Sequence, residues 1–224
     1  MERHGNRMKF FSVDGALYKF LSRLWDMVKL NFMWLLFSLP IVTVGAATVA
    51  AYSVTLKMAD EQEGYVARQF VKAFKENWRQ GIPMGLLALF CSYAVYLDFE
   101  LQRVAEGDST MFLIFGIVAA FVFGMSFIYA FPLSARYENT LIGTLKNSVN
   151  IATRYFARTL LLVAILAVEV IVFIFNYMTL FFGLLIGPAC IMLTISGFAL
   201  HFFKEIEKEP GAVREKDMGK DEEK

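Results

Sequence analysis

The sequence predicts an all-α fold, a polytopic bundle of transmembrane helices, and two observations carry that prediction. Of its 224 residues, 57% are hydrophobic and 19% are charged, whereas soluble domains are about half apolar and about a quarter charged. The chain also contains long stretches free of Asp, Glu, Lys and Arg, interrupted only by Glu169: residues 30–56, 80–97, 109–135 and 159–203. A helix needs roughly 20 apolar residues to span a bilayer, so these stretches predict membrane segments.

The first stretch, residues 30–56, carries a helix-breaking sequence at its middle. Pro40 removes a backbone donor and clashes with the preceding turn, and Gly45 permits a bend. We therefore expect a helical hairpin: a helix from about Ser12 to Leu39, a turn near Pro40–Gly45, and a returning helix to about Met58.

Two alternatives to that hairpin remain open. Only ten uncharged residues precede Pro40, and Arg23, Asp26 and Lys29 lie just before them, so the first arm could be re-entrant instead of spanning. Residues 30–56 could also form a single span, which would leave five spans in the whole chain.

The remaining stretches each predict one span, except the last. Residues 159–203 are long enough for two, with Asn176 and Tyr177 marking the turn between them. The preferred architecture therefore has six membrane segments arranged as three helical hairpins, and five spans is the alternative.

The distribution of basic residues predicts the orientation. Lys and Arg number six in residues 1–29, five in 57–79, four in 136–158 and six in 204–224, but one in 98–108. Cytoplasmic loops collect Lys and Arg. Hairpins place both termini in the cytoplasm, whereas five spans would put the basic N-terminus outside.

The chain then divides into two parts. Residues 1–203 form a single transmembrane helical domain, in which basic, aromatic and amphipathic segments precede the spans and lie at the membrane interface. Residues 204–224 form a charged cytoplasmic tail that we expect to be disordered.

Glu169 is the first candidate for a functional residue. It stands 11 residues after Arg158, about 16 Å along a helix and near the bilayer midplane, where a charge costs about 2.5–3.5 kcal/mol. It could bind a proton, a cation or a substrate hydroxyl, or be a neutral carboxyl hydrogen-bonded across a helix contact. Asn176, seven residues on, would extend this intramembrane polar site, or be a simple loop residue.

A second candidate site is the helix break formed by Pro40, Thr43 and Gly45. Free amides of a broken helix can line a ligand site. The small residues around Gly45 equally predict close helix packing, which we prefer. The sequence Gly187-Pro188-Ala189 in the last stretch invites the same two interpretations.

Several function classes are disfavoured. Cys91 and Cys190 lie inside apolar stretches, and His4 and His201 are far apart, so no metal-ligand spacing is visible. No Gly-rich phosphate loop or nucleotide fingerprint occurs, and the net charge of +1 argues against a nucleic-acid partner. We expect no enzyme, no catalytic residue, no cofactor and no metal.

The stretch KLNFMWLLFSLPIVTVGAA, residues 29–47, supported by Phe70, residues 74–78 and residues 131–133, resembles the YesL family of bacterial integral membrane proteins, a domain of unknown function. Members are often encoded beside sugar-uptake transporter genes. The resemblance therefore implies a bacterial plasma (inner) membrane and a link to carbohydrate uptake, with sugar ABC transporter permease subunits as partners beside the lipid bilayer. It supplies no functional residues.

Together these observations predict a non-enzymatic accessory or partner of carbohydrate uptake. The alternative from another class is a small standalone transporter or channel that works through the carboxylate of Glu169. The sequence predicts no particular ligand and no oligomeric state.

Overall fold

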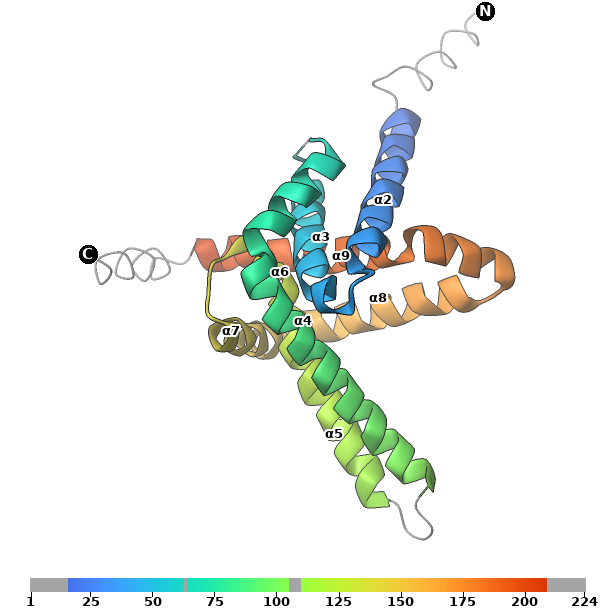
Figure 1. Ribbon diagram of the computed structural model, residues 1–224, viewed down its shortest axis with the longest axis vertical. Helices are drawn as coiled ribbons and strands as arrows, with labels where there is room; N and C mark the ends of the chain where they lie inside the picture. Colours follow the sequence, from blue (N-terminus) through green and yellow to red (C-terminus); the bar gives the residue numbers. More distant parts are fainter. Residues whose placement is uncertain (1–15, 63, 105–109, 209–224) are drawn as a thin grey trace, which may run out of the picture.

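The computed structural model describes residues 16–62, 64–104 and 110–208, and within these ranges every regular element is helical (Figure 1). In chain order the elements are α2 (Ala16–Ser38), the short 3-10 helix η1 (Ile41–Thr43), α3 (Val44–Ala59), α4 (Val66–Val104), α5 (Thr110–Phe127), α6 (Ala130–Arg136), α7 (Leu141–Arg154), α8 (Phe156–Ile174) and α9 (Tyr177–Glu207).

Three helical hairpins organise the chain: α2–α3, α4–α5 and α8–α9, with α6 and α7 joining the second to the third. Figure 1 shows α4–α5 and α8–α9 as two arms that leave a shared body in different directions, while α2 leaves it on another side. The predicted all-α bundle of three hairpins is confirmed. The turn of the last hairpin lies at residues 175–176, where the sequence placed it.

The turn of the first hairpin forms where Pro40 and Gly45 predicted it. The Thr43 hydroxyl donates to the carbonyl oxygens of Phe37 at 2.7 Å and Pro40 at 2.8 Å. The Phe37 carbonyl belongs to the last turn of α2, where helical N–H partners are missing, whereas the Pro40 carbonyl also accepts the Thr43 N–H at 2.9 Å. The chain therefore reverses within five residues, and α3 starts at Val44.

Five stretches are long and apolar enough to cross a membrane: Ile41–Ala59, Val66–Leu101, Leu113–Arg136, Phe156–Ile174 and Tyr177–Glu207. Helix α2 is not among them, and its charged residues Lys19, Arg23, Asp26 and Lys29 supply the physical reason. The first hairpin thus has one arm with the composition of a span and one amphipathic arm. By length and composition the described residues therefore contain five spans, the expected alternative, and not the preferred six membrane segments. The chain is a polytopic helical membrane protein.

The amphipathic segments that precede the spans take two forms. Residues 66–79 continue without a break into the apolar part of α4, which is 39 residues long. The corresponding segment before the last hairpin is instead a separate helix, α7, whose N-cap Thr140 accepts the N–H of Gly143 at 3.2 Å. Its Ser148 is buried and its Lys146 is exposed, so one face of α7 packs on the protein.

Helix α3 lies at the centre of the body. Ten of its 16 residues are buried, and most of these are small: Gly45, Ala46, Ala47, Val49, Ala50 and Ala51 among them. Small side chains let α2, α4, α6 and α9 approach the α3 backbone closely. The core is therefore built around the returning arm of the first hairpin.

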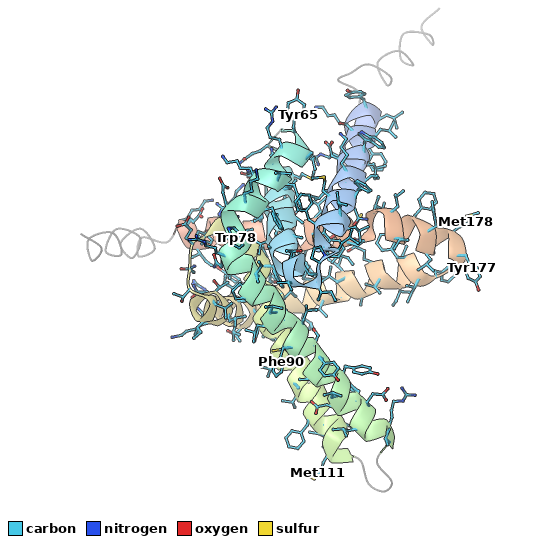
Figure 2. The ribbon with its side chains drawn as sticks, viewed as in Figure 1. Tyr65, Trp78, Phe90, Met111, Tyr177 and Met178 are labelled. Atoms are coloured by element: carbon cyan, nitrogen blue, oxygen red, sulfur yellow. The ribbon has the colours of Figure 1, made fainter. Side chains whose placement is uncertain are left out.

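The two long arms expose apolar side chains along their length. Figure 2 shows Phe90 and Met111 on the α4–α5 arm and Tyr177 and Met178 near the tip of the α8–α9 arm. Phe90 is 70% exposed and Tyr177 is 91% exposed. Such surfaces suit hydrocarbon and the membrane interface, where aromatic residues gather.

Candidate functional site

The tip of the first hairpin crosses α4 through glycines. A Cβ atom added to Gly45 would lie 2.2 Å from the Gly81 carbonyl oxygen and 2.4 Å from the Gly85 Cα. Only glycine fits at this distance. Gly81 and Gly85 are four residues apart, the spacing typical of close helix crossings in membranes. Gly45 therefore serves packing, Thr43 serves the turn, and a ligand role for Pro40, Thr43 and Gly45 stays a prediction.

Asn31 joins the first hairpin to the last one. Its Nδ2 donates to the carbonyl oxygens of Leu184 and Leu185 in α9, each at 2.9 Å. Pro188 has no N–H, so the carbonyl four residues before it, that of Leu184, lacks its helical donor. Asn31 is 2% exposed, and its amide supplies that missing donor inside the protein.

Asn31 also keeps one unused polar atom. Its Oδ1 is buried and accepts no hydrogen bond in the part of the chain that the structure describes. A buried carbonyl oxygen of this kind would take a donor if one were available. In the contact between α2 and α9, the Asn31 Nδ2 therefore donates both of its hydrogens, whereas the Oδ1 accepts none.

Glu169 lies between α8 and α9 and is half-buried. The Thr194 hydroxyl, on α9, donates to Glu169 Oε2 at 3.3 Å. The hydrogen bond across a helix contact is the structural arrangement that the sequence left open for this carboxyl. A proton, cation or substrate role for Glu169 stays a prediction.

Asn176 serves α9 locally. Its Oδ1 accepts the N–H groups of Met178 at 2.9 Å and Thr179 at 3.0 Å, and the Thr179 Oγ1 accepts the Asn176 N–H at 3.0 Å. This reciprocal arrangement is a capping box that starts the helix. The side-chain oxygen of Asn176 is therefore bonded to the first turn of α9, and a site shared with Glu169 stays a prediction.

Two cavities open beside the end of α3, and the larger of these two is polar. It has a volume of about 710 Å³ and lies between the end of α3, the first half of α4 and the end of α6. Its walls carry three basic and three acidic side chains, those of Lys57, Lys72, Arg136, Asp60, Glu76 and Glu138. The balance of charge indicates a hydrated cleft without preference for either ion sign.

Ion pairs beside this cavity tie α9 to its neighbours. Arg136 donates to both carboxylate oxygens of Glu207 at 3.1 Å, and Lys204 donates to Asp60. The hydrogen bond from Lys204, and in second place one from Gln62, holds the pKa of Asp60 below its usual value. The C-terminal end of α9 is thereby joined to α6 and to the residue after α3.

Tyr137, directly after α6, belongs to the same network. Its hydroxyl donates to Glu207. Burial, and then this hydrogen bond, raises the pKa of Tyr137 to about 12. Tyr137 therefore remains a neutral donor at any physiological pH.

Metal-binding residues do not converge in the described ranges: no group of three His, Cys, Asp or Glu side chains is placed to hold an ion there. Cys91 and Cys190 are both free thiols, on α4 and α9. His201 faces Glu205 one turn later, at 3.2 Å from its carboxylate.

Two contacts were not anticipated from the sequence, those of Asn31 and of the Gly81–Gly85 pair. Signals for both exist. Asn31 is the one carboxamide in the uncharged stretch 30–56, and the glycines have the four-residue spacing of membrane helix crossings. What the sequence does not contain is the identity of the helix that each one meets.

Comparison with known proteins finds similarity to one family. Residues 27–99, which contain Asn31, Gly45, Gly81 and Gly85, match the family described as "Protein of unknown function, DUF624". The chain is also 27% identical to "Uncharacterized protein YesL" of Bacillus subtilis (strain 168) over 157 residues, which are 68% of this chain and 74% of that protein. No solved structure matches. The two matches confirm the resemblance: the chain is similar to YesL and to a family whose function is unknown.

Proposed function

We propose that the chain is a non-enzymatic accessory or partner of carbohydrate uptake in the bacterial plasma membrane, with both termini in the cytoplasm. The observation that carries this proposal is the use of buried and half-buried polar side chains within the fold. The Asn31 side-chain amide donates to the Leu184 carbonyl oxygen. The Trp34 indole N–H donates to the Thr48 hydroxyl at 3.1 Å. The hydroxyls of Thr55 and Ser196 form a hydrogen bond at 2.7 Å.

Each of these contacts joins two helices: α2 to α9, α2 to α3, and α3 to α9. Polar groups in a membrane protein that hold helices together stabilise one arrangement of the bundle. A transporter instead lines a path with polar groups that exchange partners. The observed bonding favours a fixed scaffold over a carrier.

The resemblance to YesL supports the link with carbohydrate uptake, and the two arms suit a membrane partner. Their apolar sides are uncovered by the described helices, as at Phe90, Phe121, Leu160 and Phe181. Lipid covers these surfaces in a single chain. Spanning helices of a sugar ABC transporter permease would replace part of that lipid, and α4–α5 and α8–α9 would contact different parts of the permease.

The first experiment is affinity purification of the tagged full-length chain from native membranes in a mild detergent, followed by mass spectrometry. Permease subunits recovered in near-equal amounts would support the accessory role. An unrelated multi-pass protein with the same tag is the control. Recovery of the chain without permease subunits, at the level of that control, would contradict it.

A transport assay separates the accessory role from independent transport. Deletion of the chain should slow sugar uptake by cells, and the purified chain alone in vesicles should give no solute flux. Flux through vesicles that contain this chain alone would overturn the accessory role, whatever the deletion does.

One observation favours a standalone transporter or channel as the second candidate. Glu169 is a half-buried carboxyl within an apolar hairpin, with one hydrogen-bond donor, Thr194. If this candidate is right, Glu169→Gln abolishes flux in vesicles, whereas Glu100→Gln, at an exposed ion pair near the end of α4, preserves it.

A further inference from the structure

The smaller cavity has a polar end and an apolar interior. Its volume is about 270 Å³, and it lies between α2, the end of α3 and α9. Arg23 and Glu61 form the polar end, with 3.5 Å between guanidinium nitrogen and carboxylate oxygen. Met27, Met58 and Leu193 line the apolar part. A pocket divided in this way matches an amphiphile better than a uniformly polar solute.

Gly197 leaves the apolar part of this cavity open. A Cβ atom placed there would meet no other heavy atom within 4 Å, so α9 is indented where the cavity touches it. The neighbouring methionines, Met27 and Met58, are flexible and adapt to the shape of a bound chain. The interior therefore has both the room and the walls for a hydrocarbon chain.

The position of the cavity fits the headgroup level of a membrane. Glu61 follows the C-terminal end of α3, and Arg23 lies in the amphipathic helix α2. Trp25 of α2 is 62% exposed, and the Lys29 ammonium lies 5.7 Å from its ring centre. Exposed aromatic and basic residues on an amphipathic helix are typical of the membrane interface.

The charges at the polar end point to one headgroup chemistry. Arg23 and Glu61 are exposed at 63% and 82% of their side chains, so both face a headgroup that arrives from the membrane. One cation beside one anion matches a headgroup with a phosphate and an ammonium. A net-anionic headgroup would satisfy Arg23 and meet Glu61 unfavourably. A quaternary ammonium has no N–H to donate to a carboxylate.

We propose that this cavity binds one phospholipid with a phosphoethanolamine headgroup. The phosphate accepts from Arg23, as guanidinium groups bind phosphate, and the primary ammonium donates to Glu61. One acyl chain lies against Met27, Met58 and Leu193 and fills the space beside Gly197. Glu169 does not line this cavity.

Native mass spectrometry of the purified full-length chain tests the proposal. The protein is incubated with phosphatidylethanolamine, phosphatidylglycerol or phosphatidylcholine of identical acyl chains. Phosphatidylethanolamine should be retained about tenfold better than either of the others, the factor expected for one charge-assisted hydrogen bond. Equal retention of all three lipids would overturn the proposed headgroup.

Variants assign the effect to the cavity. Glu61→Gln should remove the preference for phosphatidylethanolamine over phosphatidylglycerol, and Arg23→Gln should weaken binding of both. Arg68→Gln, at an exposed position outside the cavity, should change neither. Persistence of the preference in Glu61→Gln would contradict the contact with the ammonium.

A second pair of variants tests the acyl chain. Gly197→Leu should fill the cavity and reduce retention of phosphatidylethanolamine about tenfold. Gly124→Leu is the matched control, because a Cβ at Gly124 in α5 also meets nothing within 4 Å but lies outside the cavity. Free phosphoethanolamine in excess should not displace the lipid. Displacement, or equal behaviour of the two leucine variants, would show that no acyl chain occupies the cavity.

Discussion

Asn31 Nδ2 donates to the Leu184 carbonyl oxygen across 153 positions of sequence, at 2.9 Å. The acceptor is the carbonyl that Pro188 leaves without its helical donor. A side chain from α2 thus replaces a hydrogen bond that is missing within α9. The same contact fixes the amphipathic first arm against the last hairpin.

Replacement of Asn31 by Leu should destabilise the protein by about 1–2 kcal/mol, because the Leu184 carbonyl loses its donor in an apolar setting. The measurement is thermal unfolding of the purified protein in detergent. Asn147→Leu, at an exposed position of α7, is the control. Equal melting temperatures for the two variants would show that the contact contributes nothing.

Substitution of the crossing glycines should be more damaging. Gly45→Ala and Gly85→Ala each force a methyl group against backbone, and overpacking costs about 1–3 kcal/mol or more. Gly124→Ala meets open space and should be neutral or slightly stabilising. The yield of folded protein from membranes and its melting temperature distinguish the two outcomes. Tolerance of alanine at Gly45 would mean that the helices separate there.

The Thr194–Glu169 hydrogen bond makes a prediction about stability that is independent of transport. Glu169→Gln retains an acceptor for the Thr194 hydroxyl, so the melting temperature should change little. Thr194→Val removes the donor and should cost about 0.6 kcal/mol, the average for such bonds in membrane helices. A loss of stability in Glu169→Gln that exceeds that of Thr194→Val would point to an ionised carboxylate with a further partner.

The Asp60–Lys204 contact should make stability depend on pH in the acid range. In the folded protein, the hydrogen bond from Lys204 lowers the pKa of Asp60. The contribution of this contact to stability is therefore complete above the unfolded-state pKa of about 3.9. It is then lost as pH falls through the lower folded value. Melting temperatures measured from about pH 6 to about pH 3 should fall less steeply in Asp60→Asn. Parallel curves for the two proteins would contradict this.

Cysteine labelling tests the topology, in a chain whose Cys91 and Cys190 are replaced by Ala. Gln62→Cys and Asn176→Cys should react from opposite sides of the membrane. Gly5→Cys, in a part of the chain outside the described residues, should react from the same side as Gln62→Cys if the first hairpin returns to its starting side. Reaction of those two from opposite sides would mean that residues 30–56 cross once.

The local features of the fold were predictable because they depend on neighbouring residues. Proline and glycine inside one uncharged stretch predicted the first turn. Asn176 and Tyr177 predicted the last turn, and Asn176 proved to be the N-cap of α9. The division of residues 109–135 into α5 and α6 was not predicted. Pro132, in the first turn of α6, has no N–H for the Ile128 carbonyl, so it is a local signal for this break. The Tyr129 N–H at the break contacts Ser148 of α7.

The sequence by itself therefore determined the membrane class, the hairpins and the turns of the first and last hairpins, since hydrophobic length, charge and helix breaking are local properties. Only the tertiary structure decided that Gly45 meets Gly85, that Asn31 meets Leu184, and that Arg23 and Glu61 flank one cavity. Apolar helices of similar length can be packed in many ways, and composition does not distinguish them. The choice among these arrangements rests on where backbones approach closely and where a carbonyl that a proline leaves unpaired needs a donor.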